Sequence, residues 1–282
     1  MIAPFTLLFE EEPNPGPGLP EAMRAVYNGD WRLSPLPAHR PLVWTNFVVS
    51  HDGRIAFNQP GWNGGNAISR GSRHDHWLME LVRARADAIL VGSATLRAAR
   101  RHRWAPGEVF AWPEFAALRE AEGRPALPAL VILSASGELP ATVALELPRT
   151  LFLLTTAEGA ERARQRYPHL ICLTGTDGQL DLSAAMAQLR HHYGIRTLLS
   201  EGGGRTYGTL LTNHLIDEVF LTINPIIVGN PSPPLAPRPG LVEGVGFAPQ
   251  SPPYLRLISL RRVDDMLFQR AKIVIPPDAK PV

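Results

Sequence analysis

The sequence predicts a mixed α/β fold in which a central β-sheet is closed by a C-terminal antiparallel hairpin. Between residues 42 and 212, short apolar runs typical of buried strands alternate with segments of helical spacing. After residue 254 the pattern changes, because two apolar segments, 255–263 and 266–274, flank Asp264-Asp265 as in a β-hairpin. Alternating strands and helices followed by a hairpin indicate a mixed sheet rather than a purely parallel one.

Strands and helices can be assigned in order from these patterns. We expect strands at 42–49, 87–91, 129–133, 150–154, 170–173 and 197–199, and a strand of about eight residues that ends at Pro225. Helices are expected at 20–27, 74–86, 158–166 and 182–191, with a further helix from Thr206. Residues 1–40 are rich in proline, and we expect them to form an extension that wraps the main domain. The main domain is expected at 41–275, followed by a tail at 276–282.

Composition limits the classes of function. The chain has 282 residues, of which 45% are hydrophobic, so it is long enough for a substantial core. A formal net charge of +2 is too small to indicate nucleic acid or a membrane surface as a partner. The single cysteine, Cys172, allows no internal disulfide and no cysteine metal cluster, and its apolar neighbours predict an inert core thiol. No metal site is predicted.

The chain ends and the charge pattern predict a cytoplasmic protein. The apolar segment 2–9 has no basic residues before it and runs into Glu10, Glu11 and Glu12, which makes it a poor signal peptide. No apolar run approaches the length that would span a bilayer. A lone cysteine fits a reducing compartment.

A glycine-rich turn follows the strand at 197–199. Gly202, Gly203 and Gly204 separate that strand from the helix at Thr206, and such a turn lets backbone N–H groups approach a phosphate. The spacing lacks the lysine of a P-loop and the third glycine of a dinucleotide fingerprint. Two interpretations therefore remain open, a nucleotide diphosphate site and a turn that serves packing alone.

Two other strand ends carry polar residues. Gly92-Ser-Ala-Thr95 follows the strand at 87–91 and forms a second transition from strand to turn. Asp52 and Gly53 end the strand at 42–49, where Asp52 either holds the turn or lines the mouth of a site. Ser134, after the strand at 129–133, is a candidate ribose or phosphate contact.

Basic residues concentrate in one segment, formed by Arg97, Arg100, Arg101, His102 and Arg103. This basic segment is either a solvated loop or a phosphate-binding element for the 2′-phosphate of NADPH or for a substrate phosphate. Helical spacing alone predicts that two further arginines, Arg83 and Arg85, are solvated.

Four segments, taken together, resemble the riboflavin-biosynthesis pyrimidine reductases, the reductase half of the bifunctional deaminase-reductase. They are Val48-Val-Ser-His-Asp-Gly-Arg-Ile-Ala56, Ile68-Ser with the helix to Arg83, Ala86-Asp-Ala-Ile-Leu-Val-Gly-Ser-Ala-Thr95, and Leu199-Ser-Glu-Gly-Gly-Gly through Asp217-Glu218 to Pro225 and Gly229. The resemblance covers roughly residues 40–275 and implies a dihydrofolate-reductase-like fold. The zinc motif of the deaminase half has no counterpart in the sequence.

The resemblance implies an NADPH-dependent reductase that passes hydride to C1′ of a ribosylamino-pyrimidine phosphate and opens ribosyl to ribityl. It also implies a homodimer, while the small net charge predicts no nucleic-acid or membrane partner. The candidate residues are, for proton transfer, Asp52 and Glu201; for the cofactor, Val48, Gly92, Ser93, Thr95, Ser134, Gly202, Gly203, Gly204, Arg205 and Thr206; and for the substrate, Ser50, Arg83, Arg103 and Glu201.

One departure from the family pattern keeps alternatives open. Family members follow the Thr95-type residue with Arg-Ala-Asp-Asp-Pro, in which the first Asp contacts cofactor, whereas Ala99 stands there in this sequence. The arginine expected for the substrate phosphate is also out of register, and Arg103 or a neighbour is the candidate replacement. A dihydropterin or dihydrofolate reductase, or a catalytically silent nucleotide-binding protein, therefore remain as alternatives.

Overall fold

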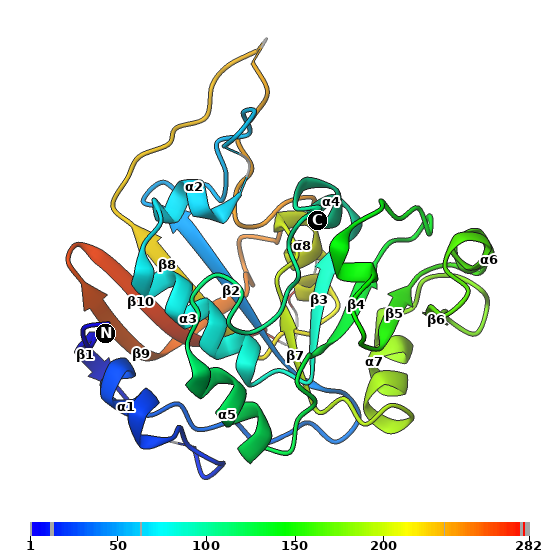
Figure 1. Cartoon of the computed structure of the whole chain (residues 1–282). Helices are drawn as coiled ribbons and strands as arrows, with labels where there is room; N and C mark the ends of the chain where they lie inside the picture. Colours follow the sequence, from blue (N-terminus) through cyan, green and yellow to red (C-terminus); the bar gives the residue numbers. More distant parts are fainter. Residues whose placement is uncertain (1, 12–13, 63, 234, 277–278, 280–282) are drawn as a thin grey trace. The chain divides into compact units, whose positions relative to one another are not determined.

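A computed structural model describes residues 2–11, 14–62, 64–233, 235–276 and 279 (Figure 1). The chain forms two compact units. Unit 1 comprises Met1–Pro35, Trp44–Met79 and Tyr207–Val282, and unit 2 comprises Leu36–Val43 and Glu80–Thr206. One boundary lies between Pro35 and Leu36, and the others fall within β2 (Leu42–Ser50), α3 (Arg73–Ala84) and α8 (Gly204–Thr212). Only two residues of the predicted tail, Pro276 and Ala279, lie within the described ranges.

Unit 1 contains a mixed sheet with the strand order β1-β9-β10-β8-β2. Its strands are β1 (Thr6–Glu10), β8 (Glu218–Asn224), β9 (Tyr254–Val263), β10 (Met266–Val274) and β2. Strands β9 and β10 form the predicted antiparallel hairpin, and β2 pairs with β8 in parallel. Asp264 has a φ of 49°, the left-handed conformation that the hairpin turn requires. The mixed α/β class is therefore confirmed.

Aromatic side chains form the core of unit 1. The ring of Trp31 meets those of Trp44 and Phe220 at centroid distances of 5.3 and 4.8 Å, and Phe5 meets Phe268 at 4.9 Å. Such edge-to-face contacts add to the stabilisation from burying the rings. Because Phe5 and Trp31 come from the proline-rich N-terminal segment, that segment is part of the packed core of unit 1.

Two short helices complete the described elements that lie wholly in unit 1. Helix α1 (Glu21–Tyr27) matches the prediction at 20–27, whereas α2 (Gly65–Ser69) falls where a loop is expected. The α3 helix begins at Arg73, and Ser72 Oγ accepts a hydrogen bond from the backbone N of Asp75 at 3.3 Å, so Ser72 caps the start of the helix.

Unit 2 contains a parallel sheet with the order β7-β3-β4-β5-β6. Its strands are β3 (Ala88–Gly92), β4 (Ala129–Leu133), β5 (Leu151–Leu154), β6 (Ile171–Leu173) and β7 (Thr197–Ser200). Every residue of β3, β5 and β7 is buried, which explains why these strands read as continuous apolar runs. Cys172 on β6 is half-buried, and desolvation raises the pKa of its thiol.

The helices of unit 2 lie between these strands along the chain. They are α4 (Ser93–Ala98), α5 (Pro113–Ala121), α6 (Ala157–Arg166) and α7 (Leu182–His191), with a 3-10 turn at Val143–Leu145. Helices α6 and α7 match the predicted positions. Helix α5 was missed, although Pro113 at its first position is a common start signal.

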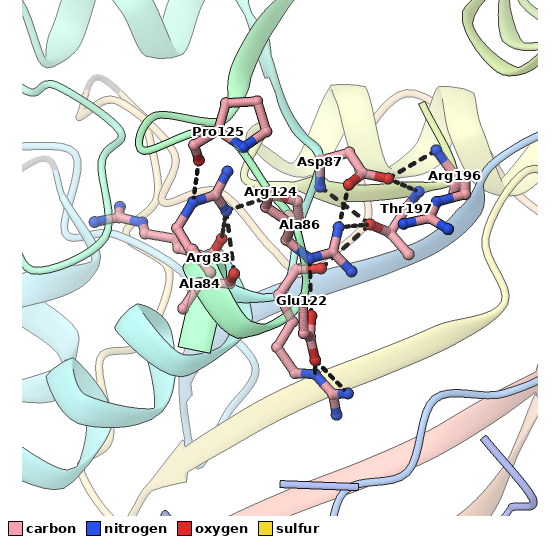
Figure 2. A network of polar contacts seen from close by, with 11 residues as sticks. Arg83, Ala84, Ala86, Asp87, Glu122, Arg124, Pro125, Arg196 and Thr197 are labelled. Atoms are coloured by element: carbon pink, nitrogen blue, oxygen red, sulfur yellow. Dashed lines mark hydrogen bonds and ion pairs between the residues drawn. The ribbon is translucent and has the colours of Figure 1, made fainter. Parts of the chain in front are cut away.

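A buried ionic network fixes the amino ends of β3 and β7 (Figure 2). The Asp87 carboxylate accepts the backbone N–H of Thr197 at 2.9 Å and pairs with Arg124. Glu122 pairs in turn with Arg124 at 2.8 Å and with Arg85 at 2.7 Å. The prediction that Arg85 is solvated is wrong, because its side chain is fully buried and its charge is paired with Glu122.

The Arg119 side chain caps the end of α3. Its guanidinium donates to the carbonyls of Ala84 and Ala86 at 3.1 and 2.7 Å, and to that of Pro125 at 2.7 Å. The last carbonyls of a helix lack intrahelical partners, so these bonds satisfy groups that would otherwise be buried and unpaired. Burial lowers the pKa of Arg119 to about 10.

Candidate functional site

The carboxyl ends of the parallel strands in unit 2 bring the predicted cofactor turns together. In this register Gly92 pairs with Leu133, and Leu90 pairs with Ser200. Ser93 and Thr95 therefore follow β3 beside Ser134, which follows β4, while Glu201 and the glycine turn follow β7. Ligands in open α/β sheets bind at this edge.

The turns after β3 and β7 are in direct contact. A Cβ atom added at Gly92 would lie 2.6 Å from Thr206 Oγ1, and one added at Gly202 would overlap the Thr206 side chain. A Cβ at Gly203 would instead meet only Thr95 Oγ1, at an ordinary 3.7 Å. Close packing against Thr206 thus explains why positions 92 and 202 are glycine. Gly203, by contrast, is half-exposed and leaves its backbone open to a ligand.

A buried ion pair lies in the same unit. The Nε and Nη2 atoms of Arg83 donate to the two carboxylate oxygens of Glu201 at 2.6 and 2.7 Å. The Arg83 side chain is 1% exposed, so the prediction of a solvated arginine is wrong. Burial alone would lower the pKa of Arg83, but the charges of Glu201 and Glu80 raise it above its ordinary value.

Further polar groups around Arg83 were not identified from the sequence. Arg83 Nη1 lies 3.3 Å from Glu80 Oε1, and Arg83 Nη2 lies 2.7 Å from His102 Nε2. Glu80 also accepts the backbone N–H groups of Gly107 and Val109, each at 2.8 Å. Burial raises the pKa of Glu80. The three-residue spacing of Glu80 and Arg83 on one helix is the signal that could have revealed this pair.

The arginines of the basic segment are exposed, while its backbone is fixed. The side chains of Arg97, Arg100, Arg101 and Arg103 make no ion pair within the described ranges of the chain. The backbone carbonyl of Arg100 accepts from Thr142 Oγ1 at 2.7 Å, and that of Arg103 accepts from a guanidinium nitrogen of Arg149. A fixed backbone with exposed guanidinium groups is suited to binding a phosphate.

Three predicted residues lie in unit 1. The Asp52 carboxylate accepts the backbone N–H groups of Val228 and Gly229 at 2.9 and 2.7 Å, and the Ser50 hydroxyl at 2.7 Å. Partial burial would raise the pKa of Asp52, but these hydrogen bonds lower it to about 2. This geometry favours the interpretation in which Asp52 holds its loop, and its role in proton transfer stays a prediction.

The unit that contains Val48 of β2 also contains a buried carboxyl group, that of Asp75. Val48 pairs in register with Thr222 of β8. Asp75 is 8% exposed, and burial raises its pKa to about 6. Unit 1 therefore contains a carboxyl group that changes protonation near neutral pH.

In the part of the chain that the structure describes, no group of three or more His, Cys, Asp or Glu side chains is arranged to hold a metal ion. Among the same residues, no helix has both the length and the apolar character needed to cross a membrane.

Comparison with known proteins gives a family match and a curated relative for this chain. The family described as the RibD C-terminal domain matches residues 41–267. A curated relative from Archaeoglobus fulgidus, 2,5-diamino-6-ribosylamino-4(3H)-pyrimidinone 5′-phosphate reductase, is 26% identical over 197 residues, which cover 69% of this chain and 85% of the relative.

Solved structures share the fold at lower identity. A pyrimidine reductase-like protein from Corynebacterium diphtheriae is 23% identical with a TM-score of 0.62, covering 84% of this chain and 93% of the other. RibD from Acinetobacter baumannii is 20% identical with a TM-score of 0.61, and the match covers 84% of this chain and 59% of RibD. The chain thus spans well under two thirds of that RibD chain. The dihydrofolate-reductase-like class expected from the sequence is confirmed by these neighbours.

Proposed function

Because the chain belongs to the RibD C-terminal domain family, we propose that it is an NADPH-dependent reductase of a ribosylamino-pyrimidine phosphate. The observation that carries the proposal is the contact between the turns at Gly92 and Gly202 in the unit that also holds Arg83 and Glu201. The A. fulgidus relative supports the substrate class, since its name describes a reductase of such a compound.

The residues of unit 2 fit a nicotinamide dinucleotide. Gly203 can accept the close approach of a pyrophosphate, because among the described residues only Thr95 Oγ1 lies within 4 Å of the position of its missing Cβ. In this proposal the backbone from Gly202 to Thr206 holds the pyrophosphate, with Ser93, Thr95 and Ser134 as further contacts. When bound, NADPH supplies the hydride that reduces C1′ of the sugar.

The chain's own residues would bind and orient the substrate. In the proposal Glu201 faces the substrate, and its bidentate pair with Arg83 fixes the direction of both side chains. Opening of the sugar ring breaks the bond between C1′ and O4′, and reduction of C1′ by hydride leaves one proton to be taken up by the product. At neutral pH Asp52 is ionised, because its pKa is about 2, so it would have to act as a base rather than donate that proton.

A substrate comparison tests the proposal. The purified protein is mixed with NADPH and the pyrimidine ribosylamine phosphate, and then with dihydrofolate, while NADPH absorbance is followed and the products are weighed by mass spectrometry. We expect oxidation of NADPH only with the pyrimidine, with a product that has gained one hydride and one proton. Turnover of dihydrofolate alone would favour the pterin alternative. Failure with both, with NADPH binding retained, would favour a silent binding protein, for which Ala99 in place of an acidic residue is the argument.

The assembly and the compartment belong to the same proposal. We expect a cytoplasmic homodimer, as in the family that the sequence resembles. Light scattering coupled to size-exclusion chromatography measures the mass in solution, and a mass near 30.9 kDa, that of one chain, would contradict the dimer.

A further inference from the structure

The orientation of Arg83 is set by partners from three parts of unit 2. The carboxylate of Glu201, which follows β7, accepts hydrogen bonds from Arg83 Nε at 2.6 Å and from Arg83 Nη2 at 2.7 Å. Glu80, one turn earlier on α3, takes Nη1 at 3.3 Å. His102, from the segment between α4 and α5, lies against the remaining hydrogen of Nη2 at 2.7 Å. The planar guanidinium therefore has little freedom to rotate.

The contact with Arg83 determines the protonation of His102. A guanidinium has only donors, so the Nε2 atom of His102 must accept the hydrogen bond with its lone pair. The imidazole proton then lies on Nδ1, which is 3.2 Å from Glu108 Oε1, an acceptor. The network thus assigns a neutral His102 with the proton on Nδ1. A second proton, on Nε2, would place two N–H groups against each other and break the contact.

The groups around His102 hold it in place. Glu108 fixes the same segment by accepting the backbone N–H of Arg103 at 2.7 Å. Arg149 acts electrostatically on both Glu108 and Arg83. The Trp104 ring packs edge-on against the imidazole at a centroid distance of 4.8 Å. The His102 side chain is 25% exposed, so a solvent proton can reach it.

We propose that His102 is a positioning residue whose neutral imidazole holds Arg83, and through Arg83 the Glu201 carboxylate that faces the substrate, in the orientation that binds substrate. Protonation of His102 removes the acceptor for Nη2, releases one edge of the guanidinium and weakens substrate binding in acid. The inference rests on the proposed function for its kinetic consequence, but the protonation state of His102 follows from the contacts alone.

Substitutions of His102 test the kinetic part. Replacing His102 with Ala removes the acceptor and raises KM by about tenfold, as expected for a lost hydrogen bond to a charged group. His102→Gln keeps an acceptor that cannot be protonated, so KM stays near the wild-type value at neutral pH and its rise in acid disappears. The control is His192→Gln, because His192 is exposed at the end of α7 and touches no part of this network. Melting temperatures of all variants identify any loss of folding.

A role for His102 in folding alone would not change the pH profile of KM. The proposal is overturned if His102→Gln keeps the wild-type rise of KM in acid, or if His102→Ala keeps the wild-type KM. Nitrogen-15 NMR of labelled histidines gives a readout that needs no turnover. We expect a neutral His102 with a protonated Nδ1 at neutral pH, and a protonated Nε2 instead would overturn the proposal even if no substrate were reduced. If NMR finds the expected form but no pyrimidine is reduced, the proposed function alone fails.

Discussion

The contact between the two glycine turns can be measured through Gly92. In Gly92→Ala the new Cβ lies 2.6 Å from Thr206 Oγ1, closer than real Cβ atoms approach oxygen, whereas the next atom, Thr206 Cβ, is at 3.9 Å. The clash comes from one atom. Overpacking of this kind costs about 2 kcal/mol. The unfolding entropy of about 2.1 cal/mol/K per residue over 282 residues is ~0.6 kcal/mol/K, so we expect Tm to fall by roughly 3 °C.

Second substitutions at Thr206 identify the atom responsible. Thr206→Ala removes Oγ1, so adding Gly92→Ala to it should cost less than about 0.5 kcal/mol. Thr206→Ser keeps Oγ1, so the full cost should remain. Gly203→Ala is the matched control, because its Cβ meets only Thr95 Oγ1 at 3.7 Å and its stability should be unchanged, while NADPH binding weakens. Urea unfolding measures each variant. An equal cost of Gly92→Ala in the Ala and Ser backgrounds would refute the reasoning.

Three further predictions concern charged groups. Glu201→Ala leaves Arg83 buried without its bidentate partner and should lower the free energy of unfolding in urea by about 3 kcal/mol. The control is Glu120→Ala, because Glu120 is exposed on α5. A loss for Glu201→Ala no larger than that of the control would contradict the role of the pair. Asp75 has a pKa raised to about 6, so it should make the wild type lose about 3 kcal/mol as pH rises from about 4 through 6. Asp75→Asn should remove this pH dependence of the free energy of unfolding. An unchanged pH profile in the variant would contradict its assignment to Asp75. Combined Arg100→Ala and Arg101→Ala should weaken NADPH far more than NADH in titrations, with Arg164→Ala plus Arg166→Ala on α6 as control, and equal losses for the two coenzymes would remove the basic segment from the site.

Local patterns were sufficient to predict the strands and the turns that follow them. The runs at 88–92 and 197–200 are buried in full. The first ends in Gly92 and the second is followed by Glu201 and three glycines, so the sequence alone indicates strands that end in tight turns. That both turns lie at one edge follows from parallel pairing. Their contact through Thr206 could not be predicted, because it depends on the register between β3 and β7.

Charged residues are where sequence reasoning failed, for a physical reason. Arginines at helical spacing are usually solvated, yet Arg83, Arg85 and Arg119 are almost fully buried. Each is compensated by groups distant in sequence, such as Glu201 for Arg83, 118 residues away. No local pattern encodes such a partner. The strand β1 was missed for a similar reason, since its pairing with β9 joins the two ends of the chain.

The crystal structure of the protein soaked with NADPH tests the account most directly. We expect electron density for the pyrophosphate against the backbone of Gly202–Thr206 and for the adjoining ribose beside Gly92–Thr95, with Arg83 and Glu201 still paired. Density for the coenzyme at any other surface, or none at a concentration that saturates turnover, would contradict the assignment of the two turns as the coenzyme site.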